Sequence, residues 1–439
     1  KAGMREMAFS FLRNSAIAEG VLEPVSAAET YHYAGDRDAP MAVWAVEIEG
    51  PFDVESRKIG LETPSQERIF TCVPQTEALE IACAEQILRS IARRAFRRPI
   101  TDVDATSLMA FYNVGRVNGS FESGIEFALR AILVDPEFLF RVEADPVAMA
   151  PGKPYQISDL ELASRVSFFL WSSIPDDELL DLAERNELRQ DGVLAAQVER
   201  MLNDQKSAAL VDNFAGQWLF LRNMRSVKPD PIAFPEFDGN LREAFQQETQ
   251  LWFDSQVREN RSVLEILTSD YTYVNQRLAE HYGIPGVLGN HFRRVTLPDE
   301  TRRGILGHGS VLTATSYANR TSPVKRGVWV LENLLGAPPP PPPADVPGLE
   351  DSDSVADPSN PESRPRSVRE RMERHRTDPV CASCHVRMDP LGFALESFDA
   401  IGGYRELPLE QTSGTLPSGL ELTGPASVRD MLLSNSEDF

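Results

Sequence analysis

The chain has 439 residues, of which 42% are hydrophobic and 8% aromatic, and this is enough for about two to four domains with buried cores. Its formal net charge of −22 creates a field that repels phosphates. The composition therefore excludes nucleic acids and anionic membranes as partners and suits a basic electron-transfer protein. No apolar run approaches the roughly 18 residues of a membrane span, so we expect no transmembrane segment.

Residues 1–70 are expected to form a small β-rich module. Residues 41–51 (MAVWAVEIEGP) are rich in valine and isoleucine and end in Gly-Pro, which favours a strand over a helix. A carbohydrate-binding sandwich has this character, so a glycan is one partner to consider, although no residue of the segment identifies a ligand. The chain begins at Lys1 without a signal peptide, and we expect it to be a mature or truncated product.

Residues 71–150 are expected to form a small helical domain. Apolar residues recur at helical spacing over residues 77–98 and stop at Pro99, and Thr101 with Asp104 then marks the next helix start. The end of the first helix carries a basic cluster of Arg93, Arg94, Arg97 and Arg98. We interpret the cluster as ion pairing with neighbouring helices, and an anion or haem-propionate site is the alternative.

Residues 151–295 are predicted to form an all-α bundle. Ser158 and Glu161 form a capping box, and helical patterns then follow one another with no clear strand. Residues 270–283 (DYTYVNQRLAEHYG) are interpreted as a turn and a helix, in which His281 makes a core or helix-end polar contact without a metal. The aromatic residues of the bundle are assigned to its core: Trp218, Phe220, Trp252 and Phe253.

Residues 296–350 are predicted to be a helix and a linker, and residues 351–439 a cytochrome c-like haem domain. The six prolines at 338–343 are expected to form a stiff polyproline II spacer. Three acidic residues beside this linker have the oxygen ligands that Ca²⁺ prefers: Glu350, Asp351 and Asp353. They lack the glycine and the terminal glutamate of an EF-hand loop, so calcium is not the favoured interpretation.

The stretch Cys381-Ala-Ser-Cys384-His385 carries the strongest chemical signal. Cys-x-x-Cys-His is the spacing that attaches a haem through two thioether bonds, and the histidine then serves as an axial iron ligand. A structural zinc would draw a fourth ligand from a second Cys or His pair, and a redox dithiol would need a thioredoxin-like βαβ context. Zinc and the dithiol remain alternatives, but we predict one covalent haem c with His385 as a metal ligand.

The other two cysteines, Cys72 and Cys83, are left free to form a disulfide if haem takes Cys381 and Cys384. Disulfides and covalently attached haem both indicate an oxidising compartment. We therefore expect the protein in the periplasm, at the cell surface or in the extracellular space.

Residues from about 87 to 405 resemble the planctomycete-type multidomain c-type cytochromes, exported proteins built of domains of unknown function with a C-terminal CxxCH haem domain. The resemblance is carried by residues 92–99 (ARRAFRRP), 271–283 (YTYVNQRLAEHYG), 321–327 (TSPVKRG), the proline run and 381–399 (CASCHVRMDPLGFALESFD). It implies a bacterial, exported, haem-bearing protein and leaves the substrate open. The acidic Ser/Pro-rich loop before the haem motif is longer here than in the family.

The second axial ligand decides between an electron carrier and an enzyme, because an open iron face admits peroxide or oxygen. We favour His308 for this position, because Gly307 and Gly309 would let a flat macrocycle approach the backbone. A core histidine bonded to the backbone is the alternative for His308. Weaker candidates for the iron are His375, Met372 and Met431, and an open site is the remaining possibility.

Further predicted cofactor contacts follow the motif. Residues 389–393 (DPLGF) are predicted to form a turn against the porphyrin edge, with Phe393 as an apolar wall. Arg387 and Arg405 are predicted to bind haem propionates, because a guanidinium pairs with a carboxylate through two hydrogen bonds. Ordinary surface charge is the alternative for both arginines.

The sequence thus predicts a mainly α-helical, extracytoplasmic cytochrome with one haem c, which transfers electrons to or from a redox protein such as another cytochrome. Two other functions remain open. One is a peroxidase-like or oxygen-activating oxidoreductase, and the other is a glycan-binding or assembly component in which haem is structural.

Overall fold

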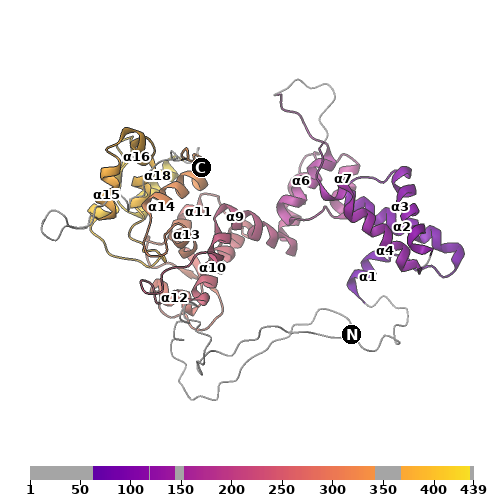
Figure 1. Cartoon of the computed structure of the whole chain (residues 1–439), viewed down its shortest axis with the longest axis horizontal. Helices are drawn as coiled ribbons and strands as arrows, with labels where there is room; N and C mark the ends of the chain where they lie inside the picture. Colours follow the sequence, from indigo (N-terminus) through magenta and orange to yellow (C-terminus); the bar gives the residue numbers. More distant parts are fainter. Residues whose placement is uncertain (1–62, 118, 144–152, 342–366, 436–439) are drawn as a thin grey trace, which may run out of the picture. The chain divides into compact units, whose positions relative to one another are not determined.

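The computed structural model describes residues 63–117, 119–143, 153–341 and 367–435. Over these residues the chain is mainly helical and carries two short two-stranded antiparallel sheets, which confirms the predicted α class. The chain divides into two compact units (Figure 1), with described residues 63–209 in unit 1 and 210–435 in unit 2.

The predicted domain boundaries at residues 70, 150, 295 and 350 remain predictions, and the division at residue 209 falls inside the predicted bundle. The strand expected at 41–51 lies outside the described residues, as do the acidic residues considered for calcium. The few described residues of the expected β-rich module carry a short helix, α1 (Pro64–Ile69).

Unit 1 is a set of helices with a disulfide near its start. In chain order its elements are α1, α2 (Glu77–Phe96), α3 (Asp102–Arg116), α4 (Phe121–Val134), α5 (Pro136–Leu139), α6 (Asp159–Trp171), α7 (Asp177–Glu184), α8 (Val193–Asn203) and η2 (Gln205–Ser207). The predicted disulfide between Cys72 and Cys83 is present and links the segment before α2 to that helix. Buried side chains of α2, α3 and α4 form the core around it, including Ile87, Leu88, Tyr112, Ile125 and Ile132.

Helix starts in unit 1 follow the local sequence. Thr101 and Asp104 form a capping box at α3, and Ser158 and Glu161 form one at α6, as predicted. Asp176 accepts the backbone N–H of Leu179 at the start of α7, where a carboxylate also meets the positive end of the helix dipole.

The ion-pair interpretation of the arginine cluster is confirmed for two of its members. Arg93 of α2 pairs with three carboxylates on α7, among them that of Glu184 at 2.8 Å. Arg98 lies 2.8 Å from Asp104 and 2.7 Å from Glu137. Exposed pairs of this kind contribute about 0–1 kcal/mol each, so their main effect is to orient α2 against its neighbours.

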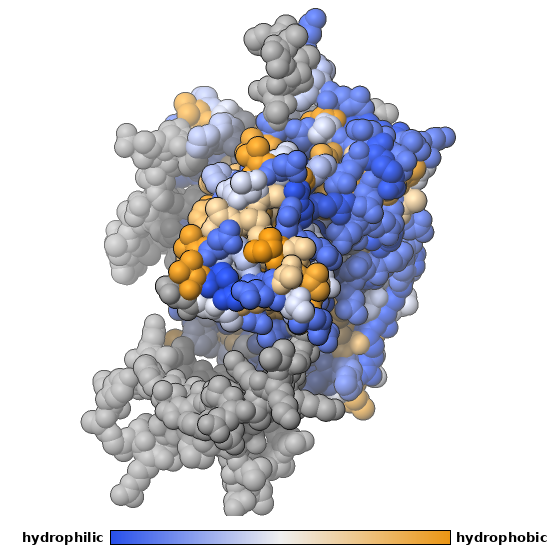
Figure 2. All heavy atoms as spheres, turned by 90° about the vertical axis from the view of Figure 1, so that its right-hand side faces the viewer, coloured by the Kyte–Doolittle hydropathy of each residue, from blue (hydrophilic) through white to orange (hydrophobic). Residues whose placement is uncertain are grey.

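One face of unit 1 leaves apolar side chains in water. Helices α3 and α4 pack along each other, and on their outer side the rings of Phe111 and Phe127 touch at a centroid distance of 6.2 Å. Both rings and Val114 are exposed, and Figure 2 shows apolar surface next to hydrophilic surface on this side of the molecule. The core of unit 1 therefore does not use all of its apolar helix faces.

Unit 2 contains the remaining helices and both sheets. In chain order its elements are η3 (Leu210–Ala215), α9 (Gly216–Trp218), η4 (Leu221–Arg225), α10 (Gly239–Arg258), α11 (Glu265–Thr268), β1 (Tyr271–Val274), α12 (Gln276–Tyr282), β2 (Arg293–Thr296), η5 (Ile305–Gly307), α13 (Gly309–Ala314), α14 (Pro323–Trp329), η6 (Val330–Leu334), α15 (Val368–His375), α16 (Pro379–Phe393), α17 (Leu409–Thr412), β3 (Gly414–Thr415), β4 (Glu421–Leu422) and α18 (Pro425–Ser434).

The prediction that residues 151–295 contain no strand is wrong. Tyr271–Val274 form β1, which pairs antiparallel with Arg293–Thr296 of β2, rather than the turn expected there. The helix that follows, α12, is capped by Asn275 and closed by Gly283 in the left-handed conformation. Strand β1 escapes sequence analysis because it is four residues long and its partner lies about twenty residues further along the chain.

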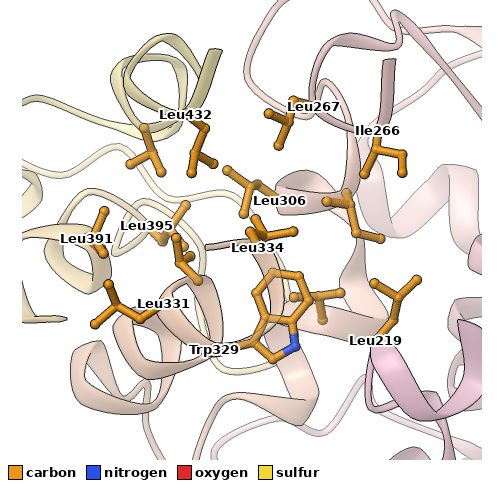
Figure 3. Packing of buried hydrophobic residues seen from close by; sticks show 14 of the residues in the cluster. Leu219, Ile266, Leu267, Leu306, Trp329, Leu331, Leu334, Leu391, Leu395 and Leu432 are labelled. Atoms are coloured by element: carbon orange, nitrogen blue, oxygen red, sulfur yellow. The ribbon is translucent and has the colours of Figure 1, made fainter. Parts of the chain in front are cut away.

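A large apolar core joins most elements of unit 2. Trp329 of α14, Leu391 of α16 and Leu432 of α18 meet in it, together with Leu306 and Ile266 (Figure 3). The predicted core aromatics are confirmed: Trp252 and Phe253 are buried, and Trp218 and Phe220 pack against the core as partly buried residues. A second cluster, around Phe245 of α10 and Leu278 of α12, completes the interior of unit 2.

Helices α14 and α16 cross with their backbones in contact. A Cβ atom at Gly327 of α14 would lie 1.9 Å from the carbonyl oxygen of Met388, and one at Gly392 of α16 would lie 1.8 Å from that of Pro323. Only glycine permits this approach from either side. The crossing therefore fixes where α16 lies.

A buried arginine next to the crossing secures the end of α16. Arg326 is 1% exposed, and its guanidinium donates to the carbonyl oxygens of Leu395, Phe398 and Asp399 at 2.6–2.7 Å. Burial lowers the pKa of Arg326 to about 10, so the side chain stays charged at neutral pH. Residues 321–327 thus hold the helix that carries residues 381–385.

We expect Gly327→Ala to destabilise the protein by about 3 kcal/mol, because its methyl group would overlap the carbonyl group of Met388. The matched control is Gly239→Ala at the start of α10, where an added Cβ has open space and the change should be neutral or slightly stabilising. Chemical denaturation of both variants measures the difference. Equal stability of the two would refute a close α14–α16 crossing.

Candidate functional site

The segment 381–385 lies in the first half of α16. Helix α15 precedes it and begins with a capping box of Ser367 and Glu370. Asp378 caps α16, Pro379 occupies its first turn, and the helix continues through Pro390. The turn predicted at 389–393 is therefore wrong: a proline usually ends a helix, but the packing of these buried residues against α14 overrides that preference.

The two thiols lie one helical turn apart on the same side of α16. Both are free cysteines and half-buried. Burial changes along the helix, since residues 379–387 are exposed or half-buried and residues 388–393 are buried. Cys381, Cys384 and His385 thus belong to the part of α16 that is only partly buried, and Cys384 packs against the core from there.

His385 is oriented by a carboxylate on its own helix. Its Nδ1 lies 2.9 Å from Oδ1 of Asp389, one turn later, and Asp389 is completely buried. The second carboxylate oxygen, Oδ2, has no hydrogen-bond partner among the described residues, and Nε of Arg376 is 3.7 Å from it. With Nδ1–H donating to Asp389, the nitrogen that keeps a lone pair for a metal is Nε2.

His375 of α15 lies directly beside His385. The two imidazoles meet edge to face at a centroid distance of 4.9 Å. Burial, and then the neighbouring His385, lower the pKa of His375. Since a flat ring keeps about 3.5–4.0 Å from each neighbour, a porphyrin does not fit between these two rings as they lie here.

The structure places His308 in the core, away from residues 381–385. Its Nδ1 is 2.9 Å from Oγ1 of Thr249, its ring packs against Trp252, and burial lowers its pKa to about 3. Among the described residues, its hydrogen bond and ring contact are both with α10. The buried position is that of the core-histidine alternative, but the ring bonds a side-chain hydroxyl and not the backbone.

The glycines beside His308 do not leave room for a macrocycle, contrary to our expectation. A Cβ atom at Gly309 would lie 2.2 Å from the ring of Phe245, and one at Gly307 would lie 2.3 Å from the carbonyl oxygen of Arg302. Side chain and backbone of the protein itself fill both spaces.

A buried glutamate lies in the same region of unit 2. Glu248 of α10 is fully buried, and its carboxylate accepts hydrogen bonds from Thr272 at 2.7 Å and Tyr282 at 2.6 Å. The Tyr282 hydroxyl in turn accepts the N–H of Gly309, and the Arg302 guanidinium lies 4.0 Å from the centre of its ring. Burial raises the pKa of Glu248 to about 7, against the lowering effect of its hydrogen bonds.

This network gives a structural role to the polar residues of the segment 271–283, which carries part of the family resemblance. Thr272 and Tyr282 both bind Glu248, and Nε2 of His281 lies 2.9 Å from the carbonyl oxygen of Ile401. The predicted core polar contact of His281 is thus confirmed. These contacts join α10, β1, α12 and the chain after α16 into one scaffold.

The other predicted cofactor residues are dispersed. Phe393 is 2% exposed, and Arg369 lies 4.4 Å from the centre of its ring. Arg405 donates to the carbonyl oxygen of Glu396 at 2.8 Å, so it supports the chain after α16. Arg387 is exposed, close to the thiols in sequence. The predicted methionine ligands are buried in the fold: Met372 in α15 and Met431 in α18.

Within residues 63–435, leaving aside the gaps already named, there is no group of three or more His, Cys, Asp or Glu side chains arranged to hold a metal ion. The described helices include none that is both long and apolar enough to cross a bilayer.

Three family models match separate stretches of the chain. Residues 83–143 match PSD5, a protein of unknown function (DUF1595); residues 157–284 match PSD4, a protein of unknown function (DUF1592); and residues 302–407 match PSCyt3, a protein of unknown function (DUF1588). These are planctomycete cytochrome c-type multidomain families, in line with the resemblance read from the sequence. No curated protein and no solved structure matches the chain.

Sequence analysis did not identify two carboxylates of unit 2, Asp389 as the partner of His385 and Glu248 as the partner of Tyr282. Asp389 follows His385 by four residues, a spacing that places both on one helix face once α16 is known to continue through Pro390. Glu248 lies among the apolar residues of α10, next to Phe245 and Trp252 in the helical period. A carboxylate on an apolar helix face is the signal that could have marked it.

We expect Glu248 to make the protein less stable as pH rises from about 4.5 to about 7. In this range the unfolded chain loses the proton that the buried carboxyl retains, because the folded pKa is about 7 and the ordinary value is 4.5. The loss amounts to about 3 kcal/mol at most. Glu248→Gln should lack this slope, so the difference between the two unfolding free energies should change with pH. Parallel curves from denaturation at several pH values would contradict the assignment.

Proposed function

We propose that this protein binds one haem c covalently through Cys381 and Cys384, with His385 as an axial iron ligand, and transfers electrons. The observation that carries the proposal is the His385–Asp389 pair beside two free thiols on one helix face. This arrangement offers one oriented imidazole nitrogen as an iron ligand and two thiols at the spacing of the motif.

The residues present fit the group. Cys381 and Cys384 would hold the group through two thioether bonds, each made by adding a thiol S–H across one vinyl group of the porphyrin, so no oxidant would be consumed. When bound, the haem supplies one-electron redox chemistry. Asp389 keeps the His385 ring in one tautomer and orientation, and the α14–α16 crossing keeps the helix in place.

We further propose that the protein works outside the cytoplasm, with another redox protein as its partner. The disulfide between Cys72 and Cys83 supports an oxidising compartment, where covalent haem is also stable. The PSCyt3 match over residues 302–407, which include the motif, supports a cytochrome-type role.

Expression with a cytochrome c maturation system tests the attachment. Haem should remain on the wild-type chain in a denaturing gel and should be lost from the double variant Cys381→Ser/Cys384→Ser. The matched control is Cys72→Ser/Cys83→Ser, which removes the disulfide and should retain haem. Haem retained without Cys381 and Cys384, or stoichiometric zinc in the purified protein, would refute the proposal.

Asp389 should lower the reduction potential of the haem. A negative charge on the hydrogen bond to His385 makes the ring a stronger donor and so stabilises ferric iron. Asp389→Asn keeps the shape and removes the charge, and we expect its potential to rise by roughly 60–130 mV, the value of one charged hydrogen bond of about 1.5–3 kcal/mol for a one-electron couple. Glu373→Gln, an exposed carboxylate on α15, is the control. An unchanged reduction potential in Asp389→Asn would show that Asp389 has no influence on the iron.

The same pair favours a second candidate function, a peroxidase-like oxidoreductase. A strongly donating axial ligand promotes O–O cleavage when the opposite face of the iron is open. The absorption spectrum distinguishes the two functions. Low-spin bands that do not change when cyanide or peroxide is added indicate a carrier, and high-spin bands that shift on this addition indicate the enzyme.

A further inference from the structure

The outer side of α3 is uncharged and mostly apolar along the whole helix. Its residues follow one another at spacings of four, three, four and three, and they are Val103, Ser107, Ala110, Val114 and Val117. All five are exposed, and the three valines are between 61% and 79% exposed. This spacing is that of the apolar seam along which one helix packs against another in a coiled coil. The described part of unit 1 places no helix against this seam.

Helix α4 extends the same apolar surface. The ring of Phe127 touches that of Phe111 on α3, and both rings are exposed. Val134, the last residue of α4, is 72% exposed. The α3–α4 face is defined here as the five residues of the outer side of α3 together with Phe111, Phe127 and Val134, and it belongs to the apolar surface seen in Figure 2.

The area of the α3–α4 face suits a protein–protein contact. Given these exposed fractions and about 150–250 Å² for an aromatic side chain, the face offers on the order of 500 Å² of apolar area. A standard interface buries about 800 Å² on each partner, and a little over half of that is apolar. One copy of the face therefore supplies the apolar share of one side of such an interface.

The electrostatics of the α3–α4 face favour a second acidic chain as the partner. None of its eight residues is charged, although the chain as a whole carries −22. Charges beside the face are paired, Asp102 with Arg89 at 2.9 Å and Glu126 with Arg130 on α4. Two copies of an acidic chain repel each other least where neither presents an unpaired charge.

We propose that the α3–α4 face binds the same face of a second copy of this chain. A two-fold axis at Ala110 places Val103 of each copy opposite Val117 of the other, because both valines are seven residues from Ala110. The small side chains of Ala110 and Ser107 allow the two α3 helices to approach closely in the middle. The dimer uses no residue of α16 and does not depend on haem.

Sedimentation velocity on the full chain tests the dimer. An interface of this size should give monomer at about 1 µM and dimer at about 100 µM. Raising the salt concentration from about 50 to about 500 mM should strengthen the dimer, because salt screens the repulsion between two acidic copies.

Val114→Glu places one carboxylate of each copy in the contact and should raise the dissociation constant of the dimer at least about tenfold. Ala110→Glu, at the proposed axis, should have at least as large an effect. The matched control is Ile232→Glu, which makes the same kind of change at a 92% exposed position of unit 2 and should leave the dimer unchanged. Since all three positions are exposed, the variants should keep the unfolding free energy of the wild type within about 0.5 kcal/mol.

Any of four results would overturn the proposal. The first is a monomer up to about 100 µM at both salt concentrations, and the second is a dimer that salt weakens, which would indicate ion pairs instead of an apolar contact. The third is equal weakening by Val114→Glu and Ile232→Glu. The fourth is a dimer that Ala110→Glu leaves unchanged.

Discussion

The contact on which unit 2 depends is the crossing of α14 and α16 at backbone distance. Gly327 and Gly392 admit the carbonyl groups of the opposite helices, and Arg326 satisfies the carbonyl oxygens after α16 with a buried charge. A buried guanidinium is stable only when its donors are used, so the arginine and the carbonyl groups need one another. The position of the thiols follows from this crossing, because they lie on the same rigid helix.

The polar interior of unit 2 has a separate centre at Glu248. Its hydrogen bonds to Thr272 and Tyr282 connect elements that are distant in sequence, and His308 takes part in the neighbouring core through Thr249. A carboxylate with a pKa near 7 is held in a region with little water. The two histidines that the sequence predicts as metal ligands thus have different surroundings, since His385 lies on the partly buried half of α16 and His308 is a core residue.

Features set by neighbouring residues were predictable from sequence. The helix starts at Thr101 and Ser158 were predicted because a cap depends only on neighbouring residues, and the Cys72–Cys83 disulfide was predicted because the motif uses the other two cysteines. Strand β1 and the surroundings of Gly309 were not, since they depend on partners far along the chain. Asp389 is an intermediate case. It is only four residues from His385, but the pairing could be predicted only if the helix was known to continue through Pro390.

The two halves of α16 differ in what limits the choice of their residues. Residues 388–393 are buried and must match the shape of the interior, whereas residues 379–387 are exposed or half-buried. Substitutions in the outer half should therefore cost less folding stability than substitutions in the buried half. A helix fixed at one end lets residues at its other end change while the scaffold stays the same.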